Sequence, residues 1–419
     1  MPSPRPAATK YQRLGRCSRF RSREERTALS SAGGRSLTGT ATTDLFGIQL
    51  KYSEGGVEGV RVLITGAAGF LGSHLVDALL QEGNHVVGYD RLSTGFLTFL
   101  ETPLGRNGGP PNPGFQFVQG DIHEEAKLAD CLQGCHVAFH LAAHADVRGG
   151  IRERGVDIQE NFLGTQRVLE AMRLADVPRL VYASSAVVYG EPDQIPTPEN
   201  YRGSQTSLYG ASKQAAEALI EAYATYYGFS VHTFRLVSLL GERYTHGVVF
   251  DFVRKLRADP THLEILGNGH QKKSYLYVKD AVRGMLLSLQ ALRPRKGEVQ
   301  AFNLGHRDAL EVRQVADVIC EEMGLEGTEY QCTGGPRGWA GDSPLVLLDL
   351  RKMESLGWAP TLSVEEAIRR TTRYLLDHPA LLAHRPAGGP LPSGEDHGPA
   401  TPAPSRVEGS DPPLGSVPS

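Results

Sequence analysis

Cysteines are few in this sequence, and their pattern excludes a fold built on disulfides or zinc. The five cysteines are scattered, at positions 17, 131, 135, 320 and 332. A disulfide framework or a structural zinc site needs paired or clustered cysteines. Only Cys131 and Cys135 lie close together, and no second pair or histidine cluster completes a set of metal ligands. We therefore expect reduced thiols, no bound metal and a location in the reducing cytoplasm.

Long apolar runs and an excess of positive charge are also missing. No stretch approaches the roughly 20 uncharged apolar residues that span a bilayer, so we expect no membrane partner. The formal net charge is −3, whereas binding to nucleic acid needs a basic face. With 40% hydrophobic and 22% charged residues, the chain has the composition of a soluble globular protein.

Both ends of the chain lack the apolar periodicity of folded segments. Residues 1–59 are rich in Arg, Ser, Thr and Gly, and the first part of this stretch contains few acidic side chains. Such a composition is typical of an organelle transit peptide, but also of a disordered extension or a start codon assigned too early, and we favour the disordered extension. Residues 384–419 are rich in Pro, Gly and Ser. They cannot bury enough surface to offset their ordering entropy, so we predict a disordered tail.

Between these ends, segments with strand and helix patterns alternate. The sequence predicts buried strands at residues 60–65, 85–89, 115–118, 137–141, 180–184 and 231–236. It predicts helices at residues 70–81, 157–174 and 207–227, and a surface loop at residues 105–114. This alternation predicts an α/β fold with a doubly wound parallel sheet, a Rossmann domain at residues 60–240. The less regular pattern after Gly241 predicts that residues 241–383 form mainly a smaller C-terminal lobe that binds the substrate.

A glycine-rich turn joins the first predicted strand to the first predicted helix. Glycine permits a tight turn there and lets a pyrophosphate approach the amides at the helix N-terminus. Asp90 ends the second strand, where it would accept hydrogen bonds from ribose hydroxyls and repel a 2′-phosphate, a preference that Arg91 would soften. The pattern therefore predicts a NAD site that contains Gly66, Gly69, Phe70, Leu71, Gly72, Asp90 and Arg91.

Tyr209 and Lys213 lie four residues apart on a predicted helix, so their side chains project from one face. Tyrosine is a poor base at neutral pH because its pKa is about 10. A neighbouring ammonium and a positive nicotinamide ring would stabilise the phenolate. That phenolate would take the proton of a sugar hydroxyl while its carbon gives hydride to the nicotinamide. Ser184 and Ser185 end a predicted strand at the same edge of the sheet, where a hydroxyl can share the proton.

Further motifs follow in a fixed order along the chain. They are Asp121-Ile122, His140-Leu141-Ala142-Ala143, Asn161 with Gly164-Thr165, Ser184 to Gly190, Tyr209-Gly210-Ala211-Ser212-Lys213, Arg235 with Gly241-Glu242-Arg243, and Ser274 to Asp280. With the glycine-rich turn, these motifs make the chain similar to the extended short-chain dehydrogenase/reductase family. Within that family the chain resembles the NAD-dependent sugar-nucleotide epimerases and dehydratases, of which UDP-glucose 4-epimerase is typical. The resemblance extends from about residue 60 to residue 377.

The resemblance implies roles for individual residues. Ser185, Tyr209 and Lys213 correspond to the catalytic trio of the family. The residues implied to line the cofactor, besides Tyr209, Lys213 and the glycine-rich turn, are Asp121, Ile122, Leu141, Ala142, Ala143 and Asn161. Family members commonly form homodimers through two helices of each subunit, which correspond to residues 157–174 and 207–227 here.

The residues after Ser185 bear on the reaction. Dehydratases of the family that act at C4 and C6 usually place an Asp-Glu pair there, and decarboxylases a Glu. This chain has Ala186, Val187 and Val188, which cannot move a proton. The resemblance therefore favours NAD-dependent epimerisation of a nucleotide-activated sugar, as by a UDP-hexose 4-epimerase acting through a 4-keto intermediate. A dehydratase or decarboxylase with its acid elsewhere in the chain stays open, as does a non-catalytic NAD-binding scaffold.

On the substrate side the chain departs from the family pattern. Lys273 stands where relatives carry an arginine, and a lysine holds phosphate as a point charge rather than as a fork. Trp339 stands where an arginine usually precedes the Gly-Asp pair that ends at Asp342. The residues expected to bind the substrate are Ser185, Ser238, Arg243, Lys273 and Arg337. For Lys273 and Arg337, a solvated surface charge is an equal alternative. His144, Asp146, Arg148 and His246 either reach toward the sugar or belong to ordinary loops.

Overall fold

The computed structural model describes residues 59–153, 155–292, 294–339 and 341–383, and four short strands before them. These strands form two antiparallel pairs and are β1 (Asp44–Leu45), β2 (Ile48–Gln49), β3 (Tyr52–Ser53) and β4 (Gly56–Val57). They lie within residues 1–59, for which the disordered extension stays a prediction. The rest of that extension and the tail from residue 384 lie outside the described residues.

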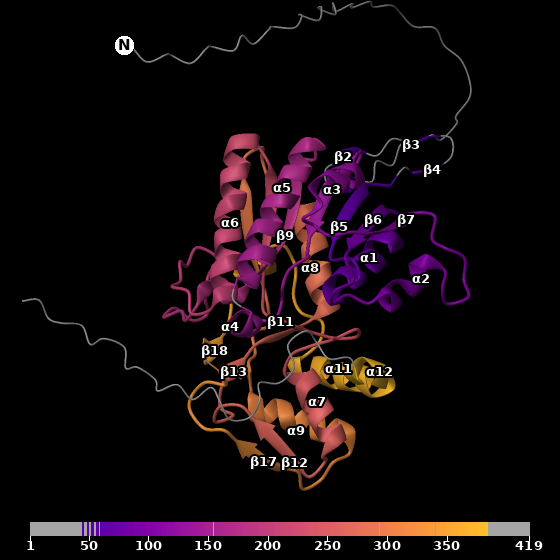
Figure 1. Ribbon diagram of the computed structural model, residues 1–419. Coiled ribbons are helices and arrows are strands. Elements are labelled where there is room, and N and C mark those ends of the chain that lie inside the picture. Colours follow the sequence, from indigo (N-terminus) through magenta and orange to yellow (C-terminus); the bar gives the residue numbers. More distant parts are fainter. Residues whose placement is uncertain are drawn as a thin grey trace, which may run out of the picture. The chain divides into compact units, whose positions relative to one another are not determined.

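A seven-stranded sheet, parallel throughout, forms the centre of the fold (Figure 1), in the order β15-β10-β9-β8-β5-β6-β7. The strands are β5 (Arg61–Thr65), β6 (His85–Asp90), β7 (Phe115–Gln119), β8 (Val137–His140), β9 (Arg179–Ser185), β10 (Ser230–Leu236) and β15 (Val299–Leu304). The order runs outward in opposite directions from β5 and β8, so their carboxyl ends form a topological switch point. The doubly wound α/β prediction is confirmed, and this edge of the sheet is where the fold places ligands.

Helices cover both faces of the sheet because its strands are apolar on both sides. Val62 and Ile64 of β5 pack in one fully buried cluster with side chains of α1 and α8, whereas Leu63, between them, packs with side chains of α5 and α6. Successive side chains of a strand point to opposite faces, which explains this division. The covering helices are α1 (Phe70–Gln81), α3 (Glu125–Leu132), α5 (Gly164–Leu174), α6 (Leu208–Tyr227) and α8 (Val278–Ala291).

Short helical segments connect these elements. The predicted helix at residues 157–174 is divided, because η2 (Ile158–Leu163) is a turn of π-helix that runs directly into α5. Such a turn is rare and marks functional sites in many proteins, and here it contains Asn161. The other connecting segments are η1 (Leu97–Leu100), α2 (Glu101–Leu104), α4 (Gly149–Arg152) and η3 (Ala186–Tyr189).

The edge strand β15 lies in the range predicted to form mainly the C-terminal lobe. It pairs in parallel with β10, with Phe302 beside Phe234. Only its second half is buried, so its sequence has no continuous apolar run that would identify a sheet strand. Both β15 and α8 belong to the sheet region, and the division of the chain at residue 241 stays a prediction.

The lobe has its own hydrophobic core, which includes Val249, Phe250, Ile319 and Ile368. Its helices are α7 (Val248–Ala258), α9 (Val312–Met323), α11 (Val364–Asp377) and α12 (Pro379–Ala383), whereas α10 (Arg351–Glu354) packs with the sheet region through Met353. Short strands complete this part of the chain: β11 (Ser238–Leu240), β12 (His262–Ile265), β13 (Lys272–Lys273), β14 (Tyr275–Tyr277), β16 (Leu310–Glu311), β17 (Glu329–Cys332) and β18 (Leu345–Val346). Figure 1 shows α7, α9 and α11 grouped away from the central sheet.

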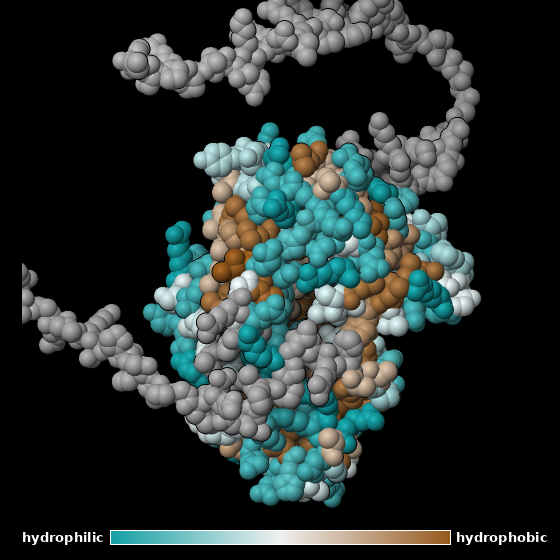
Figure 2. Space-filling model, in the orientation of Figure 1, coloured by the Kyte–Doolittle hydropathy of each residue, from teal (hydrophilic) through white to brown (hydrophobic). Residues whose placement is uncertain are grey.

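Exposed apolar side chains gather on one side of the sheet region, and Figure 2 shows apolar surface over α6. Among the large hydrophobic residues that are exposed in the described part, six belong to η2, α5 or α6: Ile158, Leu163, Leu174, Leu208, Tyr226 and Tyr227. Within the described ranges no helix is long and apolar enough to cross a membrane. In the same ranges, no group of three or more His, Cys, Asp and Glu side chains is arranged to hold a metal ion.

Candidate active site

The glycine-rich turn brings three backbone segments into close contact at the end of β5. Gly66 has φ +73°, and a Cβ at this position would lie 2.8 Å from the backbone nitrogen of Ala142. A Cβ on Gly72 would overlap the carbonyl oxygen of Gly66. Gly69 caps α1 without a side-chain hydrogen bond, so the amides of the first turn of the helix stay free for an anion. The turn therefore has the close backbone packing and the uncapped amides that the predicted pyrophosphate site requires.

Asp90 ends β6 beside this turn and is largely buried. Its carboxylate accepts hydrogen bonds from the backbone nitrogens of Ala68 (3.0 Å) and Leu92 (2.7 Å). Burial raises the pKa of Asp90, and these two amides act in the opposite direction. Asp90 thus ties the glycine-rich turn to β6, a role additional to the predicted contact with ribose.

Arg91 is occupied by two carboxylates. Its guanidinium lies 3.1 Å from Asp121 and 3.1 Å from Glu160. A 2′-phosphate on the adenosine ribose would have to compete with both carboxylates for this arginine. The pairing of Arg91 therefore supports the preference for NAD over NADP that Asp90 predicts.

Ile122, which the resemblance places beside the cofactor, is buried. It packs against Gly164, where a Cβ would come within 2.6 Å of the Cδ1 atom of Ile122.

A buried polar chain begins at the end of β5. The hydroxyl of Thr65 lies 2.8 Å from Nδ1 of His140, and Nε2 of His140 lies 3.0 Å from the hydroxyl of Thr165. Burial lowers the pKa of His140 to about 3, so the ring is neutral and can donate from one nitrogen and accept at the other. Thr165 in turn donates to the carbonyl of Asn161 (2.6 Å). This chain connects β5 and β8 to the π-helical turn.

Asn161 extends the chain to the helix that carries Tyr209. Its Nδ2 donates to the hydroxyl of Ser212 (3.1 Å), which donates to the carbonyl of Tyr209 (2.8 Å). Its Oδ1 accepts from the backbone nitrogen of His144 (2.8 Å). Asn161 therefore joins the loop after β8 to the first turn of α6, which holds the backbone of Tyr209 relative to the sheet.

Tyr209 is the second residue of α6 and is 8% exposed. The hydroxyl of Ser207 caps this helix by accepting from the backbone nitrogen of Gly210 (3.0 Å). Burial raises the pKa of Tyr209 to about 12, and a hydrogen bond with Ser185 opposes this rise. Tyr209 and Ser185 are therefore brought together as predicted, but the phenol is protonated at neutral pH in this structure.

Lys213 makes its hydrogen bond to the end of β9. Its ammonium donates to the carbonyl of Ala183 in β9 (3.0 Å) and lies 4.9 Å from the centre of the Tyr182 ring. Among the described residues no hydrogen bond joins Lys213 to Tyr209. Burial lowers the pKa of Lys213 to about 8, while Glu217 and Asp157 act in the opposite direction. Burial and the charge of Asp157 raise the pKa of Tyr209 here, and the reduction expected from the ammonium together with the nicotinamide ring stays a prediction.

The two serines at the end of β9 have different surroundings. Ser185 contacts Tyr209, whereas the hydroxyl of Ser184 donates to Glu217. Glu217 also forms a buried ion pair with Arg235, with 2.6 Å between Nη2 and Oε2. Ser185 is therefore the serine that can reach a substrate. The Glu217–Arg235 pair was not predicted, although the i and i+4 spacing of Lys213 and Glu217 places both on one face of the helix.

The predicted substrate-binding cations separate into two places. Lys273 and Arg337 both contact Asp342: the ammonium of Lys273 lies 2.6 Å from its carboxylate, and Arg337 donates to its carbonyl (2.9 Å). Arg337 also pairs with Glu191. Arg243, in contrast, forms a 2.8 Å ion pair with Asp77 of α1. The structure thus brings Lys273 and Arg337 together and places Arg243 elsewhere.

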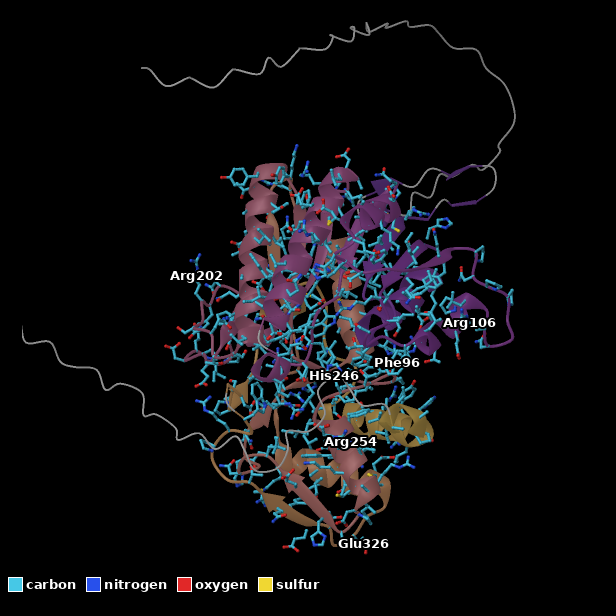
Figure 3. The ribbon with its side chains drawn as sticks, in the orientation of Figure 1. Phe96, Arg106, Arg202, His246, Arg254 and Glu326 are labelled. Atoms are coloured by element: carbon cyan, nitrogen blue, oxygen red, sulfur yellow. The ribbon has the colours of Figure 1, made fainter. Side chains whose placement is uncertain are left out.

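Ser238 is exposed at the start of β11, where it pairs with Tyr275 of β14. The loop after β8 contacts the lobe, since Arg148 lies 3.5 Å from Asp251 of α7. Figure 3 labels His246 where the lobe meets the sheet region, and Arg254 on α7. Asp146 pairs with Arg152 (2.9 Å). Asp146 and Arg148 are therefore engaged in ion pairs around the opening of the site.

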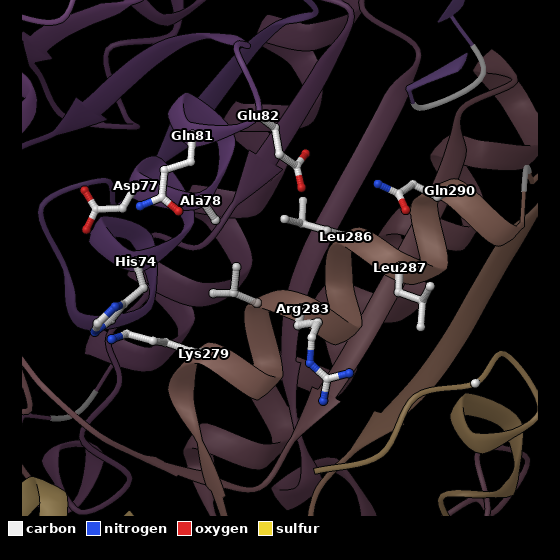
Figure 4. Close-up of a pocket in the computed structure, with 12 residues that line it drawn as sticks. His74, Asp77, Ala78, Gln81, Glu82, Lys279, Arg283, Leu286, Leu287 and Gln290 are labelled. Atoms are coloured by element: carbon white, nitrogen blue, oxygen red, sulfur yellow. The ribbon is translucent and has the colours of Figure 1, made fainter. Parts of the chain in front are cut away.

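Two cavities lie near these elements. A groove of about 630 Å³ between α1 and α8 contains His74, Asp77, Lys279 and Arg283 and none of the predicted site residues (Figure 4). A smaller cavity of about 260 Å³ is lined by Val147, Gly150, Thr206, Ser207, Leu208, Trp339 and Gly341. Two of its lining residues, Ser207 and Leu208, directly precede Tyr209 in the chain, and Trp339 stands where relatives usually carry an arginine. None of the predicted site residues lines this cavity itself.

Comparisons with known proteins agree with this geometry. The profile of the NAD dependent epimerase/dehydratase family matches residues 62–305, and the chain belongs to this family. It is 34% identical to UDP-glucose 4-epimerase of Mycolicibacterium smegmatis over 75% of this chain and 98% of the relative. The crystal structure of a UDP-galactose 4-epimerase superposes with a TM-score of 0.67 at 36% identity, covering 76% of this chain and 99% of the other.

A dehydratase is also among the similar structures. DesIV, a dTDP-glucose 4,6-dehydratase of Streptomyces venezuelae solved with NAD, has a TM-score of 0.69 at 28% identity and covers 77% of this chain and 98% of its own. The chain is therefore an enzyme of this family, which removes the alternative of a non-catalytic scaffold, and its cofactor is NAD. The family contains both epimerases and dehydratases, so the reaction has to be argued from the site.

Proposed function

We propose that the protein epimerises C4 of a UDP-hexose through a transient 4-keto sugar. The observation that supports this proposal is that none of the three residues after Ser185 can carry a proton. Ala186 and Val188, which follow Ser185 in η3, belong to the hydrophobic core, and Val187 is half-buried. Elimination of water or carbon dioxide needs a further acid or base, whereas epimerisation needs only one group that takes and returns a proton.

Tyr209 would take the proton of the C4 hydroxyl and later return it, and Ser185 would share this proton and hold the developing carbonyl oxygen. When bound, NAD would supply a carrier that holds the C4 hydride and gives it back to the opposite face of the 4-keto sugar, and it would supply the positive charge of the nicotinamide ring. Because burial raises the pKa of Tyr209 to about 12, the phenolate depends on positive charge brought to this site. Lys213 would hold the cofactor and keep a positive charge at the base of the pocket.

The sugar would occupy the cavity that Ser207, Leu208 and Trp339 help to line, with the aromatic side chain of Trp339 forming one wall. Lys273 and Arg337 would bind the diphosphate, and Ser238 would contribute a hydroxyl. Since Lys273 and Arg337 already face Asp342 and Glu191, a bound diphosphate would take over part of these ion pairs. Arg243 contacts α1 and is the least favoured of the predicted diphosphate ligands.

The test is incubation of the protein and NAD with UDP-glucose, UDP-N-acetylglucosamine, UDP-glucuronate and a GDP- or CDP-sugar, followed by mass spectrometry and NMR. The expected result is an unchanged mass with an inverted proton signal at C4 for one UDP-hexose. Loss of water or carbon dioxide would replace the epimerase by a dehydratase or decarboxylase. No product from any sugar nucleotide, with NAD bound, would contradict the proposal as a whole.

We also propose a homodimer formed through η2, α5 and α6. Six exposed apolar or aromatic side chains lie on these elements, and such a gathering on a soluble protein marks an interaction surface. Leu174→Glu combined with Tyr227→Glu should yield a monomer in light scattering. Ile195→Glu, at an exposed apolar residue away from these helices, is the control and should leave the dimer intact. A wild-type monomer at micromolar concentration would refute the dimer.

We propose a location in the cytoplasm because the described cysteines are free thiols. Cys131, Cys135, Cys320 and Cys332 are free, and burial raises the pKa of Cys131 and Cys135, so these two are poorly reactive. Cell fractionation with an antibody against the protein would test the proposal, and recovery from an organelle would revive the transit-peptide alternative.

A further inference from the structure

His144 and Asp157 form a pair that the sequence did not connect. His144 follows the end of β8, and Asp157 lies directly before η2. Nδ1 of His144 lies 2.8 Å from Oδ1 of Asp157. The side chain of Asp157 is 2% exposed, and that of His144 is 19% exposed. A buried carboxylate is thus joined to an imidazole that is partly exposed.

The second oxygen of Asp157 is left without a partner. Oδ2 is buried and makes no hydrogen bond within the described residues. It lies against the backbone of Gly150, where any Cβ would overlap it. An ionised carboxylate that is buried and only half satisfied is costly unless a positive charge compensates it. His144 is the one side chain that hydrogen bonds to it in the described part of the chain.

A chain of hydrogen bonds connects the His144–Asp157 pair to Tyr209. The backbone nitrogen and carbonyl of His144 both bond to the amide of Asn161 (2.8 and 3.2 Å), four residues after Asp157. The same amide reaches the carbonyl of Tyr209 through Ser212. The charge of Asp157 extends this far, since it raises the pKa of both Tyr209 and Lys213. An uncompensated Asp157 would therefore oppose the phenolate.

Other charged groups around His144 are engaged with different partners. Asp146 on its own loop pairs with Arg152, Glu160 of η2 pairs with Arg91, and Arg148 pairs with Asp251 of α7. His246 approaches from the loop before α7 and lies in the same electrostatic environment. Lys213 and Tyr209 face the pair from α6. Asp157 is the group that bonds directly to the imidazole.

We propose that His144 is a positioning residue for the reaction: its imidazolium compensates the buried charge of Asp157 and so permits Tyr209 to ionise. The proposal rests on the role of Tyr209 as the base in the proposed function. The hydrogen bond with Asp157 raises the pKa of His144 above 6.5, and burial opposes this. The pair is neutral while His144 is protonated. As the pH rises through the pKa of His144, the pair acquires a net negative charge, which opposes the phenolate.

The test is a spectrophotometric titration of the Tyr209 phenolate in the full-length protein saturated with NAD, with Tyr209→Phe subtracted to remove the other tyrosines. His144→Gln leaves Asp157 uncompensated even where the wild-type imidazole is protonated, so the part of the Tyr209 titration that falls below the pKa of His144 should move upward by about one pH unit, the order expected for one buried charge near a titrating group. Asp157→Asn should move it downward. The double variant should lie between the two single variants. The acid limb of kcat/KM for the sugar nucleotide should follow the same order.

His262→Gln is the matched control, because His262 also bonds an aspartate, Asp259, but on the exposed surface of the lobe. It should leave the titration unchanged. Equal or absent shifts in His144→Gln and His262→Gln would overturn the proposal, as would an upward shift in Asp157→Asn. If Asp157→Asn fails to fold, His144→Gln alone decides. The titration needs no substrate and therefore measures the coupling of His144 to Tyr209 independently of the reaction. If no sugar nucleotide is converted, the epimerase proposal is overturned, but the result of the titration still stands.

Discussion

The cofactor side and the substrate side of this active site differ in how their charged groups are partnered. On the cofactor side, the first turn of α1 offers backbone amides without a side-chain cap, and Asp90 holds the turn that presents them. On the substrate side, Lys273 and Arg337 already face carboxylates. An anion therefore binds directly to the first region, whereas in the second it must displace existing ion pairs. This difference predicts tight binding of the dinucleotide and weaker binding of the sugar nucleotide.

The largest effect is expected from a substitution at Tyr209, which lies between the cofactor side and the substrate side. Tyr209→Phe removes the group proposed to take the proton, so turnover should fall at least about 1000-fold while NAD stays bound. Tyr226→Phe is the control, because Tyr226 lies on the same helix and is 83% exposed. Product formation and nicotinamide fluorescence measure the two effects. Turnover within twofold of the wild type would refute the assignment of Tyr209.

The backbone requirement of the cofactor side can be tested at Gly66. Gly66→Ala should weaken NAD binding about 100-fold and lower the free energy of unfolding by about 3 kcal/mol, because its Cβ would press on Ala142 in addition to the cost of positive φ. Gly134 has the same φ of +73° and no atom within 4 Å of its Cβ position. Gly134→Ala should therefore cost only about 1 kcal/mol. Urea unfolding and NAD titration distinguish the two, and equal losses would contradict the packing argument.

Lys213 should support catalysis but lower the free energy of unfolding. Its pKa is lowered from 10.5 to about 8, so between these values the unfolded chain binds more protons than the folded one, and stability rises with pH. At neutral pH the buried ammonium costs about 3 kcal/mol, offset by about 1 kcal/mol from its hydrogen bond to Ala183.

Lys213→Met should therefore abolish turnover and raise the free energy of unfolding by about 2 kcal/mol near pH 7. The gain relative to the wild type should shrink as the pH rises from about 8 to 10.5. Lys127→Met, at an exposed lysine of α3, should show neither effect. Urea unfolding at several pH values is the measurement, and a gain that does not vary with pH would exclude this explanation.

The smallest effects are expected on the substrate side. Lys273→Ala should raise KM about 10-fold with kcat nearly unchanged, because one charge contact is worth about 1.4 kcal/mol. Glu191→Gln should lower KM about twofold by releasing Arg337 from its ion pair. Arg243→Ala should leave KM nearly unchanged, since Arg243 contacts Asp77 of α1. An increase in KM with Arg243→Ala as large as that with Lys273→Ala would contradict the proposal that Lys273, and not Arg243, binds the diphosphate.

Much of the fold was predictable because neighbouring residues determine it. The helix predicted at residues 70–81 is α1 with the same bounds, and the six predicted strands agree with β5 to β10 to within one residue at each end. β15 escaped prediction because its first half is only partly buried at the edge of the sheet. The division of the helix at residues 157–174 also escaped, since nothing local to Asn161 indicates a π-helical turn.

For the active site, the sequence by itself determined which residues stand at the carboxyl edge of the sheet: the glycine-rich turn, Asp90, Ser185 and Tyr209. Their places follow from strand and helix periodicity, which depends on residues a few positions apart. Only the tertiary structure decided their partners. Lys213 bonds to β9, Ser184 bonds to Glu217, and His144 bonds to Asp157, because the carboxyl ends of β8 and β9 and the start of α6 meet there. Ionisation depends on these distant neighbours and on burial, and neither can be inferred from spacing along the chain.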